Sequence, residues 1–118
     1  MEDFFKGRLK NFNAAINGFK YYFTSQINAK IELAAVIVVL TTAYIFNFTK
    51  SDFIICILCC VMVITLEIMN TAIEILVDKI SPEYNKTAGM IKDVSAAAVL
   101  TASAGALIIF IILLNSYL

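Results

Sequence analysis

Histidine is absent from this 118-residue sequence, and its absence excludes several kinds of chemistry. The chain lacks the commonest general base, the commonest transition-metal ligand and every triad built around an imidazole. It also lacks a surplus of basic charge, because nine Lys and Arg residues balance nine Asp and Glu residues. The sequence therefore offers no overall basic surface for nucleic acid, and no nucleic-acid partner is predicted.

Cysteine occurs only three times, at Cys56, Cys59 and Cys60, and all three lie in one apolar stretch. The Cys56-x-x-Cys59 spacing resembles that of a redox pair, but thiols in apolar surroundings are inert. Free cysteine is also among the residue types most often buried as a small hydrophobic side chain. We therefore predict that these cysteines pack inside the protein.

Charged residues make up only 15% of the chain, whereas hydrophobic residues make up 61%. With a mean hydropathy of +0.87, the sequence is too apolar for an ordinary soluble domain of this size. Its length corresponds to one domain, residues 1–118. The predicted fold class is an all-α integral membrane protein.

Three long apolar segments are predicted to cross the membrane as helices, at residues 31–48, 53–80 and 90–117. A bilayer core requires about 20 apolar residues per helix, and the three segments are of suitable length. A polar turn at residues 49–52 joins the first two, and Pro82 ends the second because the residue before a proline is disfavoured in a helix. Small residues between positions 95 and 106 favour close packing of helices or subunits.

Residues 4–23 are predicted to form an amphipathic helix. Its apolar stripe repeats at spacings of four and three, and consists of Phe5, Leu9, Phe12, Ile16, Phe19 and Phe23. Lysine and asparagine occupy much of the remaining surface, which indicates a helix lying in the membrane interface. The alternative is a soluble helix packed on a core, but this chain has little soluble core to offer. The polar residues 24–32 are predicted to link this helix to the first span.

Lysine and arginine predict the orientation of the chain in the membrane. Most of them precede the first span or flank the second loop, and the first loop holds Lys50 alone. Because cytoplasmic loops carry the excess of basic residues, the N-terminus and the second loop are predicted to be cytoplasmic.

Polar side chains recur along the cytoplasmic half of the second span, at Glu67, Asn70, Glu74 and Asp78. At about 100° per residue, spacings of three, four and four keep them on one helix face. Carboxylates near lipid repel one another and are costly to desolvate, so this acidic stripe is a functional-site hypothesis. Lys92 is predicted to lie on the same side of the membrane.

The acidic stripe and Lys92 together suit phosphoryl transfer, which depends mainly on positioning and on neutralising charge. Carboxylates can bind Mg²⁺ alongside substrate phosphates, a further carboxylate can accept a hydroxyl proton, and lysine can contact phosphate oxygens. No GxxxxGK[ST] motif or protein-kinase signature is present. Two alternatives remain: a polar network that sets helix register, and a small cation-coupled transporter.

Three motifs resemble the prokaryotic diacylglycerol kinase family, which includes undecaprenol kinases. They are Glu67-Ile-Met-Asn70-Thr-Ala-Ile-Glu74-Ile-Leu-Val-Asp78, Ser81-Pro-Glu-Tyr84 and Lys92-Asp93-Val-Ser-Ala-Ala-Ala-Val. The resemblance covers essentially the whole chain. It implies a homotrimer in the membrane that transfers the γ-phosphate of MgATP to a lipid alcohol, either diacylglycerol or undecaprenol.

The resemblance also implies roles for individual residues. Glu67 would be the general base for the lipid hydroxyl, Asn70 would help to position the reacting groups, and Glu74 would ligate Mg²⁺. The nucleotide and its phosphates would be bound by the remaining residues, which are Asp78, Tyr84, Lys92, Asp93, Arg8 and Lys10.

One position departs from the family pattern. A second magnesium-binding Glu is expected before the first span, and Gln26 stands in its place, within Gln26-Ile-Asn28-Ala-Lys-Ile31. A neutral amide oxygen should bind Mg²⁺ more weakly than a carboxylate does. Glu32 is six residues further on, too far round a helix to be a simple replacement. A family member with weakened or no catalysis, acting as a membrane structural or lipid-binding protein, is therefore the alternative function.

Overall fold

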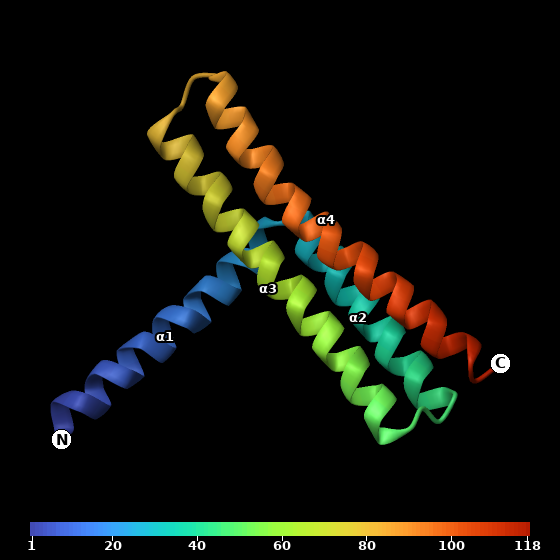
Figure 1. Cartoon of the computed structure of the whole chain (residues 1–118). Helices are drawn as coiled ribbons and strands as arrows, with labels where there is room; N and C mark the ends of the chain where they lie inside the picture. Colours follow the sequence, from blue (N-terminus) through green and yellow to red (C-terminus); the bar gives the residue numbers. More distant parts are fainter.

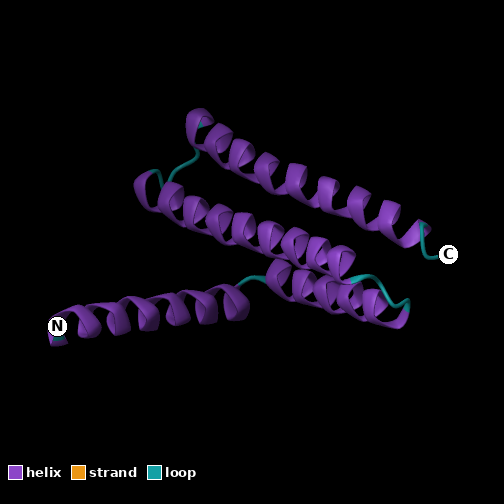
Figure 2. Ribbon diagram, turned by 60° about the horizontal axis from the view of Figure 1, so that its bottom comes forward, coloured by secondary structure: helices purple, strands orange, loops and turns teal.

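Four α-helices and no strands make up the computed structural model, which describes all 118 residues. They are α1 (Glu2–Ser25), α2 (Ile27–Ile45), α3 (Lys50–Ile80) and α4 (Lys86–Asn115). Helices α2, α3 and α4 lie side by side, while α1 projects away from them (Figures 1 and 2). The predicted all-α class is confirmed.

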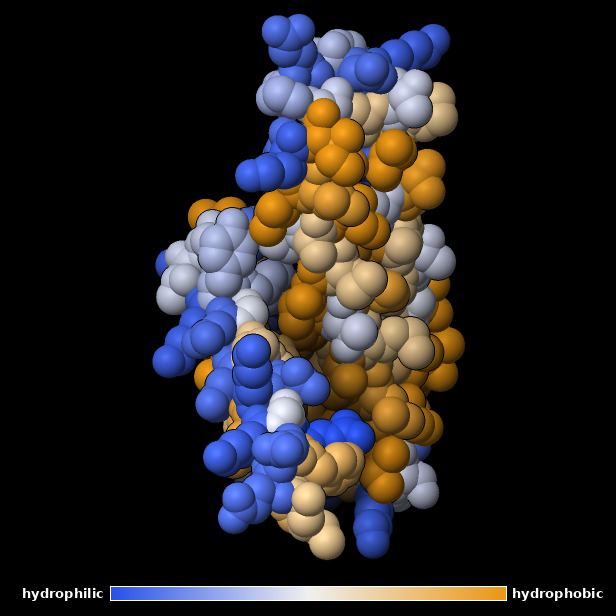
Figure 3. Space-filling model, turned by 90° about the vertical axis from the view of Figure 1, so that its left-hand side faces the viewer, coloured by the Kyte–Doolittle hydropathy of each residue, from blue (hydrophilic) through white to orange (hydrophobic).

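The three bundled helices are each long and apolar enough to cross a membrane. Only 8 of the 118 residues are buried within the chain, so most large apolar side chains face outward. Figure 3 shows hydrophobic side chains covering the bundle, with hydrophilic ones gathered at the top, around the α3–α4 loop, and over α1. In water this surface would be unfavourable, so lipid or other subunits must cover it.

The link between α1 and α2 differs from the prediction. Residues 24–32 were expected to be a polar linker, but only Gln26 is non-helical, with φ −110° and ψ 120°. The polar side chains here do not break the helix because they bond within it: the Thr24 hydroxyl donates to the Lys20 carbonyl at 2.6 Å. Helix α2 therefore begins at Ile27, four residues before the predicted span, and ends at Ile45.

The turn between α2 and α3 lies slightly earlier than residues 49–52, where it was predicted. Asn47 takes a left-handed conformation, with φ 55°, which asparagine tolerates better than most residues. Thr49 then caps α3, because its hydroxyl oxygen accepts a hydrogen bond from the Asp52 N–H at 3.2 Å. Lys50 and Asp52 thus belong to the first turn of α3.

The turn between α3 and α4 begins where predicted but ends earlier. Helix α3 ends at Ile80, just before Ser81 and Pro82. Asn85 caps α4, since its side-chain oxygen accepts from the N–H groups of Thr87 and Ala88 at 2.8 and 3.3 Å. Helix α4 therefore begins at Lys86, four residues before the predicted span.

The C-terminus is tied to the α2–α3 turn by Tyr117. Its ring stacks on Phe48 with the centroids 4.2 Å apart. Its hydroxyl donates to Asp52 Oδ2 at 2.6 Å and accepts from the Thr49 N–H at 2.8 Å. These contacts join all three bundled helices at the end opposite the acidic stripe.

We expect Tyr117→Phe to lower the free energy of unfolding by about 1–2 kcal/mol, because Asp52 and the Thr49 N–H both lose a hydrogen-bond partner. The ring stacking should survive. Thermal unfolding in detergent would measure the loss. Tyr44→Phe is the matched control, since Tyr44 is 78% exposed and its hydroxyl makes no hydrogen bond. Equal stability of the two variants would contradict a stabilising role for the hydrogen bonds of the Tyr117 hydroxyl.

Candidate functional site

The acidic stripe lies on α3 as one continuous helical face. Glu67, Asn70 and Glu74 are half-buried, whereas Asp78 is exposed. The Asn70 side chain donates from Nδ2 to Glu74 Oε1 at 3.0 Å, as residues four apart on a helix can. This bond holds the Glu74 carboxylate in a defined orientation on the face of α3.

Asn70 also has an unused acceptor. Its Oδ1 atom is buried and has no hydrogen-bond partner. A buried carbonyl oxygen without a donor costs about 1–3 kcal/mol, so such atoms are rare in folded proteins. The position suits a donor brought by a ligand, next to a carboxylate that Asn70 already holds.

Asp78 and Lys92 connect the end of α3 to the start of α4 as an ion pair. They line a polar cavity of about 410 Å³, together with residues of the connecting loop: Ser81, Pro82, Glu83, Tyr84 and Asn85. Tyr84 is 91% exposed at the edge of this cavity. Asp93 is exposed and does not line it.

Two residues near Glu67 were not identified from the sequence. Tyr22 is only 2% exposed, and its hydroxyl donates to Glu32 Oε2 at 3.0 Å. Burial raises the pKa of Tyr22, and so do its hydrogen bond to Glu32 and the charges of Glu32 and Glu67. Tyr22, Glu32 and Glu67 therefore form one cluster, which we call the elbow cluster. The sequence could have indicated Glu32 as a site residue, because it is a lone acid at the start of an apolar segment.

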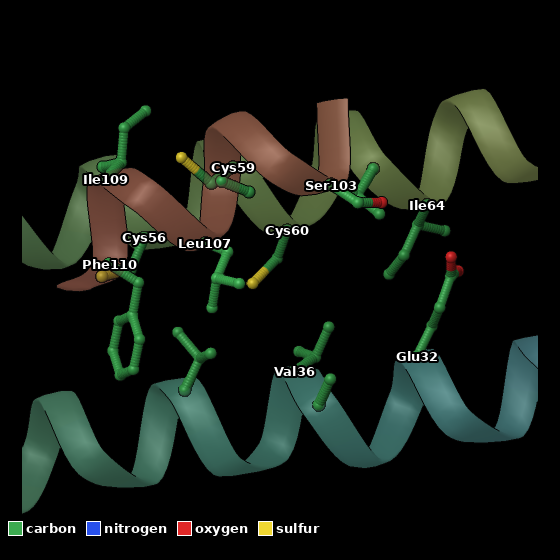
Figure 4. Close-up of a pocket in the computed structure, with 14 residues that line it drawn as sticks. Glu32, Val36, Cys56, Cys59, Cys60, Ile64, Ser103, Leu107, Ile109 and Phe110 are labelled. Carbon is green, nitrogen blue, oxygen red and sulfur yellow. The ribbon is translucent and has the colours of Figure 1, made fainter. Parts of the chain in front are cut away.

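An apolar cavity of about 240 Å³ lies between α2, α3 and α4, and Glu32 is its only charged lining residue. Figure 4 shows Glu32 pointing from α2 towards Ile64 of α3, at one end of the cavity, with Phe110 at the other. The three cysteines also line it. All three thiols are free; Cys56 is buried as predicted, whereas Cys59 and Cys60 are half-buried.

Three residues of the predicted site belong to α1 or to its junction with α2. Gln26 is the non-helical residue between α1 and α2. Arg8 and Lys10 are exposed on the part of α1 that projects from the bundle (Figure 1). The Arg8 guanidinium carbon lies 5.0 Å from the centroid of the Phe4 ring, a cation–π contact within α1.

The donor set fits a magnesium ion that is bound together with phosphate. No group of three His, Cys, Asp or Glu side chains is arranged to enclose a metal. Mg²⁺ usually keeps several waters and takes one or two carboxylates plus substrate phosphates, so such a group is not required. Glu74, oriented by Asn70, supplies one carboxylate of this kind.

The comparisons with known proteins agree on one family. The family model described as "Prokaryotic diacylglycerol kinase" matches residues 13–114. A diacylglycerol kinase of Escherichia coli (strain K12) is 46% identical over 56 residues, 48% of this chain and 46% of that protein. A diacylglycerol kinase of a Synechocystis species is 32% identical over 102 residues, 86% of this chain and 58% of that protein. The matches thus span about half the length of these curated relatives.

Proposed function

The chain belongs to the prokaryotic diacylglycerol kinase family, and on that premise we propose that it transfers the γ-phosphate of MgATP to the hydroxyl of a membrane lipid alcohol. The observation that carries the proposal is the acidic stripe on α3. It runs from Glu67 in the elbow cluster to Asp78, which lines the polar cavity. One helix face therefore connects a lipid-facing carboxylate to a water-facing cavity.

Each part of the stripe has a role in this reaction. Glu67 accepts the proton of the lipid hydroxyl as its oxygen attacks the γ-phosphorus, and the bond from that phosphorus to the β–γ bridging oxygen breaks to release ADP. Glu74, held by Asn70, would bind Mg²⁺, which when present neutralises charge on the phosphate oxygens. The unpaired Asn70 Oδ1 accepts a hydrogen bond from a donor on the bound substrates.

The polar cavity is proposed to take the nucleotide. Lys92 is paired with Asp78 in the structure, and a phosphate group can replace that carboxylate as the partner of the ammonium. An exposed ion pair of this kind contributes little to stability, so exchanging it costs little. Tyr84 borders the cavity and offers an aromatic face. Asp93, which the family resemblance also places at the nucleotide, lies outside this cavity. Arg8 and Lys10 would contact the nucleotide from the projecting α1.

The proposed setting is a homotrimer in the bacterial inner membrane, with the site on the cytoplasmic side. The support is the large apolar surface that the isolated chain leaves uncovered, together with the distribution of Lys and Arg along the sequence. Diacylglycerol and undecaprenol are the candidate lipids, since both present one hydroxyl on long apolar tails.

The test of the proposed function is MgATP-dependent phosphate transfer in detergent micelles, with diacylglycerol and undecaprenol offered side by side. Transfer to either lipid supports a kinase and identifies the substrate. No transfer to either, in a protein that unfolds cooperatively, would favour a non-catalytic membrane or lipid-binding role. Cation-coupled flux into vesicles, abolished by Glu67→Gln, would instead support a transporter.

We expect Gln26→Glu to lower the Mg²⁺ concentration needed for half-maximal transfer. The variant restores the acid that the family resemblance places at this position, and an added carboxylate oxygen is a better ligand for Mg²⁺ than an amide oxygen. The measurement is the transfer rate against Mg²⁺ concentration, with Gln26→Asn as the uncharged control. An unchanged Mg²⁺ dependence in Gln26→Glu would show that position 26 does not reach the metal.

A further inference from the structure

Tyr22 stands out among the residues of α1. It is the largest fully buried side chain in the protein and the only buried residue of this helix. The part of α1 before Tyr22 projects from the bundle (Figure 1), and its large apolar side chains are exposed. Tyr22 is thus the point at which the projecting helix is anchored to the bundle.

The Tyr22 hydroxyl bridges the bend between two helices. Tyr22 lies in the last turn of α1, Glu32 lies in the second turn of α2, and Gln26 between them breaks the helix. The hydrogen bond from the hydroxyl to Glu32 Oε2 spans ten residues of sequence. The buried ring anchors the α1–α2 bend, and the hydroxyl fixes the orientation of the Glu32 carboxylate.

Glu32 needs the Tyr22 hydroxyl as a donor because a second carboxylate, Glu67, lies near it. Its side chain points towards Ile64 of α3 (Figure 4), one helical turn before Glu67, and Glu67 interacts with it electrostatically. Two carboxylates close together in a partly buried place repel each other. The only ion pair in the chain joins Asp78 and Lys92, so no cation offsets the charge of Glu32. The Tyr22 hydroxyl is its one hydrogen-bond donor.

We propose that Tyr22 is a positioning residue of the phosphotransfer site, which acts by holding the Glu32 carboxylate beside Glu67. This inference rests on the proposed function. Glu32 in turn keeps Glu67 on the side of α3 that faces the α1–α2 bend, where a lipid hydroxyl at the membrane interface would meet it. Without the hydroxyl, the Glu32 side chain turns away from Glu67, and the base loses its fixed orientation.

The nucleotide end of the site should be insensitive to loss of the Tyr22 hydroxyl, because the buried ring that anchors α1, and with it Arg8 and Lys10, remains in Tyr22→Phe. The polar cavity with Asp78 and Lys92 lies at the far end of α3, and no residue of the elbow cluster lines it. A defect at Tyr22 should therefore lower kcat and leave the KM for MgATP unchanged. General destabilisation of the fold would change both constants or the amount of folded protein.

The test compares Tyr22→Phe with Tyr21→Phe in the phosphate-transfer assay. Phe keeps the ring of Tyr22 and removes only the hydroxyl. Tyr21 is the matched control, since it is adjacent, 51% exposed, and its hydroxyl makes no hydrogen bond. We expect kcat of Tyr22→Phe to fall about tenfold, the lower end of what losing a hydrogen bond to a charged group costs, with an unchanged KM for MgATP. Tyr21→Phe should match the wild type.

A double-mutant cycle shows whether Tyr22 acts through Glu32. In Glu32→Gln, residue 32 has no charge to be repelled by Glu67, so adding Tyr22→Phe should cost no further activity. If the two substitutions lower kcat by factors that multiply, the inference is overturned. A Tyr22→Phe variant with the kcat of the wild type would also overturn it.

If the wild type transfers phosphate to neither lipid, the proposed function falls and this inference falls with it. If Tyr22→Phe does not fold, Glu32→Ala decides alone, because it removes the side chain beside Glu67: a kcat equal to that of the wild type overturns the inference.

Discussion

Replacing Glu67 by Gln is expected to abolish most of the proposed lipid kinase activity, lowering kcat by about 10³-fold. The amide has nearly the shape of the carboxylate but cannot accept the proton of the lipid hydroxyl at neutral pH. Because Glu67 lies beside Glu32, removal of its charge also relieves a repulsion, so the fold should become no less stable. The loss should therefore arise from the chemical step, with the KM for MgATP nearly unchanged.

The measurement is steady-state transfer to the lipid that serves as substrate, with nucleotide binding followed separately. Glu2→Gln is the control for loss of a carboxylate, since Glu2 is exposed at the start of α1, far from the elbow cluster. A Glu67→Gln variant that keeps more than about a tenth of the activity would exclude Glu67 as the general base.

Replacing Glu74 by Gln is expected to raise the Mg²⁺ concentration for half-maximal transfer by about 100-fold, the upper end of what losing a residue that supports a metal site costs. Gln still presents an oxygen to Asn70 Nδ2, which donates to Glu74 Oε1 at 3.0 Å. The substitution therefore removes the charge and keeps the hydrogen bond. Excess Mg²⁺ should restore part of the rate.

Asn70→Ala separates the effect of the Glu74 charge from the effect of its orientation. It leaves the Glu74 charge in place but removes the side chain that orients it, so the Mg²⁺ dependence should shift in the same direction by a smaller factor. If Glu74→Gln lowers the rate equally at every Mg²⁺ concentration, Glu74 does not bind the metal, and its role must lie elsewhere in the site.

Much of the fold followed from local features of the sequence. Apolar runs of sufficient length predicted three helices able to cross a membrane, and the Ser81-Pro82 pair predicted where α3 ends. The spacing of Asn70 and Glu74 placed them on one face, as their hydrogen bond confirms. These features depend only on residues close together in the chain, so periodicity and composition are sufficient to predict them.

The α1–α2 bend illustrates where local reasoning failed. Polar composition suggested a linker over residues 24–32, whereas the structure has two helices separated by Gln26 alone. Polar side chains such as that of Thr24 bond to carbonyls one turn back, so they do not end the helix. Helix α2 consequently begins earlier, and Glu32 sits within it, facing α3.

The sequence by itself determined the membrane class, the helix order and the acidic stripe, because hydrophobic length and the helical repeat are properties of short segments. Only the tertiary structure decided which distant side chains meet: Tyr22 with Glu32 beside Glu67, Asp78 with Lys92, and Tyr117 with Asp52. Such pairs depend on how far each helix extends and which face it turns to its neighbour. No periodicity within one helix carries that information, so these contacts could not be read from the sequence.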